Sequence, residues 1–185
     1  MAFVKYLSVV ALLACLPALG LASSEKWVLD HATVTYTTHH PLKTTKASSK
    51  LVKGFGQCSN GKCEFLIAAP VKSFESGDSN LDLHMLQTTR GAANPMIVVR
   101  STVDESDLDK DTVALTLDIE FAGKKATYRN VLFKTVSKGE GTAHLKGSFT
   151  IKLDDFAITA PSLLAMSIKN DIPIEADAYW KKAGK

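Results

Sequence analysis

The eleven residues from Ala143 to Leu153 read AHLKGSFTIKL, with Leu145, Gly147, Phe149 and Ile151 at odd positions and polar side chains at most even ones. Side chains that alternate with a period of two are typical of a β-strand with one apolar and one polar face. The segment from Leu115 to Phe121 repeats the pattern. On this reading His144 lies on the polar face and is expected to be solvated.

The alternation extends outward over most of the chain and predicts about eight strands. They cover residues 27–39, 48–58, 62–74, 95–103, 111–121, 124–137, 140–153 and 167–180. So many antiparallel strands in one small domain favour an all-β fold closed into a barrel, because closure removes exposed sheet edges. A sandwich of two sheets is the competing topology.

Two segments interrupt the alternation and are rich in leucine and methionine. Residues 79–87 lack β-branched side chains and suit a helix of about two turns, capped by Ser79 or Asn80. Residues 160–166 suggest a short helical turn with Pro161 near its start. We expect one or two short helices at a mouth of the barrel.

Two cysteines flank a turn signal in Gln57–Phe65, which reads QCSNGKCEF. Asn60-Gly61 favours a two-residue hairpin turn, which places Cys58 directly opposite Cys63. A zinc site needs further ligands, and a redox site needs a different spacing near a βαβ unit. The sequence therefore predicts a structural disulfide and an oxidising compartment.

The N-terminus has the layout of a secretory signal peptide. Lys5 precedes a short apolar run that Pro17 ends, and small residues follow up to Ala22. We expect residues 1–22 to be removed, leaving a domain over 23–185 that is periplasmic or secreted. The alternative is a membrane-anchored lipoprotein acylated at Cys15. The apolar run is too short for stable membrane insertion.

The charge of the chain excludes one class of partner. The formal net charge of +3 falls to +2 once Lys5 is removed with the leader, and no basic block is present. Nucleic acid is therefore not an expected partner.

We expect the protein to be a monomer or a homodimer.

A barrel of eight strands either fills with its own side chains or holds one small ligand. Small inward residues such as Ala69, Gly147 and Ala176 leave room for an elongated apolar guest. A filled core is the alternative. The residues expected to line a lipid site are Phe65, Leu83, Met85, Leu86, Met96, Phe121, Phe133, Phe149, Leu163 and Leu164.

Several motifs in the same order resemble the YceI-like polyisoprenoid-binding family. They are the opening Trp27–Tyr36, the pair His40 and Val52–Gly56, the run Asn80–Met85, the run Asn94–Val99, and the close Gly147–Ile158. Leu81 stands where the family usually carries arginine. The resemblance spans Trp27 to Trp180 and implies a lipocalin-like exported barrel that holds a polyisoprenoid or another long lipid.

The resulting hypothesis is a binding or transport protein with no catalytic residues, no cofactor and no metal. Its partner is a long-chain apolar lipid, either polyisoprenoid or quinone-like. Asp82, His84 and Gln87 are expected at the mouth, where they can bind a head group. The alternatives are an exported enzyme and a stress-related scaffold without a bound lipid. Asp82 and His84 lie two residues apart, so a helix points them to different faces and no catalytic pair is expected.

Overall fold

The computed structural model describes residues 25–184. The expected signal peptide, residues 1–22, and the alternative acylation site Cys15 lie outside the described residues. Within the described range there is no helix long and apolar enough to cross a membrane.

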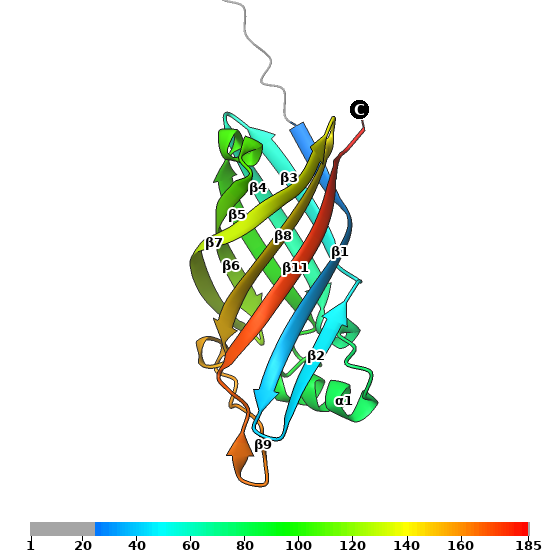
Figure 1. The fold of residues 1–185 in the computed structure, drawn as a ribbon, viewed down its shortest axis with the longest axis vertical. Coiled ribbons are helices and arrows are strands. Elements are labelled where there is room, and N and C mark those ends of the chain that lie inside the picture. Colours follow the sequence, from blue (N-terminus) through cyan, green and yellow to red (C-terminus); the bar gives the residue numbers. More distant parts are fainter. Residues whose placement is uncertain (1–24, 185) are drawn as a thin grey trace, which may run out of the picture.

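One antiparallel sheet curls into a closed barrel (Figure 1). Its strands are β1 (Glu25–His40), β3 (Lys53–Ser59), β4 (Lys62–Pro70), β5 (Met96–Asp104), β6 (Thr112–Phe121), β7 (Lys124–Gly139), β8 (Thr142–Lys152) and β11 (Asp171–Lys182). Strands β1 and β11, the first and last along the chain, pair with Leu29 opposite Trp180 and close the barrel. The predicted all-β barrel is confirmed, and the two-sheet alternative is wrong.

The remaining elements are short, and most of them lie at the ends of the barrel. They are β2 (Lys43–Ser49), η1 (Val71–Ser73), α1 (Ser79–Thr88), η2 (Glu105–Asp109), η3 (Asp154–Phe156), β9 (Ser162–Leu163) and β10 (Met166–Ser167). Figure 1 shows α1 and β9 at one end and the C-terminus at the other. We call the end that carries α1 and β9 the mouth.

The β3–β4 hairpin turns at the far end of the barrel. Asn60 and Gly61 have φ angles of 53° and 76°, as a two-residue hairpin turn requires. Cys58 therefore lies opposite Cys63, with Cα atoms 3.9 Å apart and a disulfide between the side chains. Both cysteines are buried. The predicted Cys58–Cys63 disulfide is confirmed.

The region predicted as one strand over 48–58 is two strands. Strand β2 ends at Ser49 and β3 begins at Lys53. Strand β2 pairs with the mouth half of β1, and β3 pairs with the other half. The break at residues 50–52 lets the chain cross from one half of β1 to the other.

Three local predictions are wrong. The α1 helix is capped by Asp78, whose carboxylate accepts hydrogen bonds from the backbone N–H groups of Asn80 and Leu81, and Ser79 and Asn80 are helical. Residues 160–166 do not form a helical turn, because Ser162–Ser167 is a small hairpin. His144 does lie on the outer face, but its ring is buried under neighbouring side chains.

Candidate functional site

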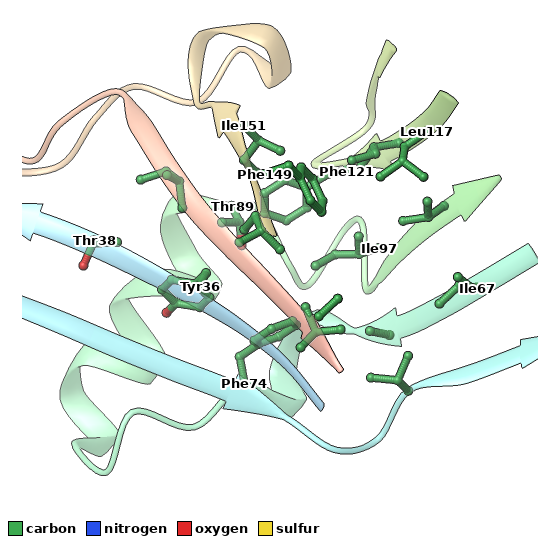
Figure 2. Close-up of a pocket in the computed structure, with 18 of the residues that line it drawn as sticks. Tyr36, Thr38, Ile67, Phe74, Thr89, Ile97, Leu117, Phe121, Phe149 and Ile151 are labelled. Carbon is green, nitrogen blue, oxygen red and sulfur yellow. The ribbon is translucent and has the colours of Figure 1, made fainter. Parts of the chain in front are cut away.

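The barrel encloses an elongated cavity of about 440 Å³. This volume lies within the usual range for small-molecule sites, about 300–1,000 Å³. Side chains from β1, β4, β5, β6 and β8 converge on it, including Tyr36, Ile67, Ile97, Leu117 and Phe149 (Figure 2). The predicted ligand-sized interior is therefore present, and the filled-core alternative does not hold.

The wall is apolar over most of its depth because each strand turns one alternate set of side chains inward. Near the far end Phe65 packs edge-on against Trp180, with ring centroids 5.1 Å apart. Ala69 and Ala176 border the cavity. Gly147 does not leave room for a ligand, because a Cβ atom there would lie 2.7 Å from the ring of Phe133, which already occupies the space.

The residues predicted to line the site divide into two groups. Five of them contact the cavity: Phe65, Met85, Phe121, Phe133 and Phe149. Leu83, Met96 and Leu164 are instead exposed, with 54%, 40% and 76% of their surface accessible. Leu86 packs beside Gly91 and Val71, away from the cavity wall. The side chain of Leu163 lies outside the described part of the structure.

The cavity reaches the surface at the mouth, because exposed Leu42, Lys43 and His84 are among its lining residues. The β1–β2 hairpin and the β9–β10 hairpin form part of this rim. They are tied together by His40, whose Nε2 donates to the carbonyl oxygen of Met166 at 3.0 Å while its Nδ1 accepts from the N–H of Leu42. The two hairpins of the rim are thus joined by a hydrogen bond.

The three predicted mouth residues all lie on α1, but only His84 borders the cavity. The carboxylate of Asp82 accepts a hydrogen bond from the backbone N–H of Ser76 at 2.9 Å, so it holds the loop before the helix. Gln87 is exposed and does not contact the cavity. No hydrogen bond joins Asp82 to His84 within the described structure.

Tyr36 was missed by the sequence reading. It lies on the inner face of β1, in the series Ala32, Val34, Tyr36, Thr38 that lines the cavity. Burial, followed by the negative charge of Asp82, raises the pKa of Tyr36 to about 12. The phenol therefore stays protonated at neutral pH, and its O–H has no hydrogen-bond partner among the described residues. The alternation of residues that begins at Ala32 could have predicted the inward position of Tyr36.

The potential metal ligands of residues 25–184 do not form a usable site. Among the described residues, one group of three donors comes together, namely Cys58, Cys63 and Glu105. The disulfide occupies both sulfur atoms. What the interior offers chemically is a long apolar wall with hydroxyl and imidazole groups at one open end.

Comparison with known proteins agrees with this architecture. A family model described as YceI-like domain matches residues 27–179. A polyisoprenoid-binding domain from Saccharophagus degradans implicated in plant cell wall breakdown is 12% identical, with a TM-score of 0.69 over 85% of this chain and 98% of that one.

Two further structures have the same fold. Burkholderia cenocepacia BcnA is 14% identical, with a TM-score of 0.67 over 80% of this chain and 95% of its own. The Campylobacter jejuni YceI protein is 11% identical, with a TM-score of 0.54 over 100% and 92% of the two chains. No curated protein sequence matches the chain.

Proposed function

The chain belongs to the YceI-like domain family, and from this premise we propose that it binds a long apolar lipid, polyisoprenoid or quinone-like, without chemically altering it. The single observation that carries the proposal is the apolar cavity of about 440 Å³ that opens at the mouth. The description of the similar Saccharophagus degradans domain as polyisoprenoid-binding supports this class of ligand.

The energetics favour a long ligand over a short one. Burial of apolar surface contributes about 25 cal/mol per Å². Association costs about 4–15 kcal/mol in lost freedom of motion. A hydrocarbon must therefore bury roughly 160–600 Å² before it gains any net affinity. A chain of several isoprene units that fills the barrel meets this condition, whereas a short volatile hydrocarbon does not.

Polar groups at the mouth are suited to a lipid head group. Tyr36 and His84 lie at the open end of the cavity and offer hydrogen-bonding groups, and the Tyr36 phenol stays protonated at neutral pH. We propose that they contact the polar end of a lipid whose chain occupies the barrel. In this proposal Asp82 and Gln87 do not contact the lipid, because neither borders the cavity.

The protein acts in an oxidising compartment in this proposal, either the periplasm or the cell exterior. The buried Cys58–Cys63 disulfide supports that location, because such bonds persist mainly outside the cytosol. A carrier in that compartment needs no catalytic residue.

Native mass spectrometry of the purified protein, followed by organic extraction, tests the proposal. We expect an added mass that extraction removes and identifies as a long-chain lipid, and we expect the stripped protein to bind a fluorescent apolar probe. Extracts from an expression host without the gene serve as the blank. A clean protein mass together with no probe binding would contradict lipid binding.

The mouth residues are tested by comparing a polyprenyl alcohol with the hydrocarbon of equal length. His84→Ala and Tyr36→Phe are expected to weaken binding of the alcohol about threefold to tenfold and to leave the hydrocarbon unchanged. Gln87→Ala, on the same helix but away from the cavity, is the matched control. Equal affinity of every variant for both ligands would remove the head-group role.

A further inference from the structure

Ser101 is a polar residue in an otherwise apolar part of the cavity wall. It lies on β5, opposite Phe65 of β4 and Leu117 of β6. Only 6% of its surface is exposed. Among residues 25–184, its hydroxyl is the one buried side-chain oxygen or nitrogen without a hydrogen-bond partner.

The position of Ser101 separates it from the other polar lining residues. Those belong to the rim, on the mouth half of β1, on β2, on and directly after α1, and at the start of β9. Ser101 is deeper, since the next inward-facing residue of its strand, Val103, lies opposite Cys63 at the far end. The hydroxyl oxygen is buried inside the barrel, away from the mouth.

A buried hydroxyl without a partner lowers stability, so folded proteins seldom keep one without a role. Its strand partners Phe65 and Leu117 carry hydrocarbon side chains, and Ser101 itself borders the cavity. A ligand is therefore the natural source of the missing partner. The side chain must rotate about its Cα–Cβ bond to reach that ligand, because the Oγ atom is covered in the present rotamer.

We propose that Ser101 determines specificity by hydrogen bonding to an uncharged oxygen on the part of the lipid that enters deepest. This rests on the proposed lipid-binding function. The group is a carbonyl, ether or alcohol oxygen, and it is not a phosphate or a carboxylate. Burying an ion next to one hydroxyl is strongly unfavourable, and the formally charged lining side chain, Lys43, lies at the mouth.

The preferred guest is thus an oxygenated lipid with polar atoms at two levels. One level is the mouth, where Tyr36 and His84 lie, and the other is the deep position of Ser101. A plain hydrocarbon leaves the Ser101 hydroxyl without a partner. Because the penalty for that hydroxyl is the same before and after a hydrocarbon binds, Ser101 favours oxygenated lipids without excluding the rest.

The test measures displacement of a fluorescent apolar probe by a long-chain methyl ketone and by the alkane of equal carbon number. In Ser101→Ala, the affinity for the ketone is expected to fall about fivefold to tenfold, and the affinity for the alkane to stay within about twofold. Ser101→Thr keeps the hydroxyl and is expected to keep the preference. Ala69→Ser, which adds a hydroxyl elsewhere on the wall, controls for polarity alone.

A second readout separates this role from a structural one. Removing a hydroxyl without a partner is expected to leave the Tm of the stripped Ser101→Ala protein unchanged or raised. A lowered Tm with an unchanged ketone preference would mean that the hydroxyl serves the fold, and it would overturn the proposal. If both ligands bind equally well to all variants, the Ser101 role alone fails. If neither ligand nor the probe binds, lipid binding itself fails and the Ser101 role with it.

Discussion

The ring of His144 stacks on the ring of Tyr179 on the outside of the barrel, with centroids 3.8 Å apart and planes inclined by 14°. His31 stacks on the same tyrosine with centroids 4.2 Å apart. The three rings come from β8, β11 and β1, so they span the pairing between the first and last strands that closes the barrel. A bulge between Leu29 and His31 turns His31 to this outer face.

We expect His144→Ala to lower the free energy of unfolding by about 1–3 kcal/mol, measured by urea denaturation. The substitution removes a buried ring and the hydrogen bond between His144 Nε2 and Asp177, which is 2.6 Å long. His31→Ala is the matched control, because its side chain is 61% exposed and its loss should cost less than half as much. Equal losses of unfolding free energy in the two variants would show that the burial of His144 contributes no extra stability.

Stability is expected to fall in acid partly through Asp177. Burial by itself raises the pKa of this carboxyl, but hydrogen bonds from Lys146 and His144 outweigh burial and hold the pKa below its usual value. A carboxyl with a depressed folded-state pKa stabilises fully above its unfolded pKa, near 3.9, and the effect is lost as pH falls through the folded value. The free energy of unfolding should therefore drop below about pH 4.

Asp177→Asn should make that acid-induced drop shallower, because the variant has lower stability at neutral pH and one carboxyl fewer to protonate. Urea denaturation between neutral and acidic pH measures both slopes. Asp111→Asn removes a negative charge from the exposed turn before β6 and controls for net charge. Superimposable slopes for wild type and Asp177→Asn would refute the assignment.

Replacing both Cys58 and Cys63 by alanine should lower the free energy of unfolding by about 2 kcal/mol, the chain-entropy value for so short a loop. Loss of the buried sulfur atoms adds to this figure. The same measurement on wild type in reducing buffer should give a smaller loss, because both buried sulfur atoms remain, while the double variant should not respond to the reductant. A reductant-sensitive double variant would point to another cause.

The sequence pattern predicted the strands better than the mouth, for a physical reason. Alternation over residues 143–153 reports a strand directly, and Asn60-Gly61 specifies its turn through backbone preference. The β9–β10 hairpin carries no such signal, because its turn residues Leu164 and Ala165 have φ angles of 52° and 62°. Neither residue type favours that conformation. Pro161 and the leucines therefore suggested a helix.

Contacts between distant strands account for the other differences. Periodicity correctly placed His144 on the outer face, but Tyr179 from β11 covers it. Periodicity also finds inward residues without showing which ones border open space. Gly147 accommodates the ring of Phe133, whereas Ala69 and Ala176 border the cavity. Ser101 stood in an inward position, and its missing hydrogen bond is visible only once its neighbours are placed.

Filling the cavity gives the most direct test of where a lipid binds. Ala176 lies on the inner face of β11 and borders the cavity, so Ala176→Phe places a ring in the space proposed for the lipid chain. We expect the affinity for an apolar probe to fall by at least about tenfold, because the ring and the chain compete for one volume. The free energy of unfolding should change by less than about 2 kcal/mol, since the ring enters existing space.

The adjacent exposed residue on the same strand supplies the control. Glu175→Phe adds the same ring to the outer face, where it should leave probe affinity unchanged. Far-UV circular dichroism should give the same β-sheet spectrum for both variants and wild type. If Ala176→Phe folds and still binds the probe as tightly as Glu175→Phe, then the lipid does not occupy the barrel, and binding must be sought on the outer surface.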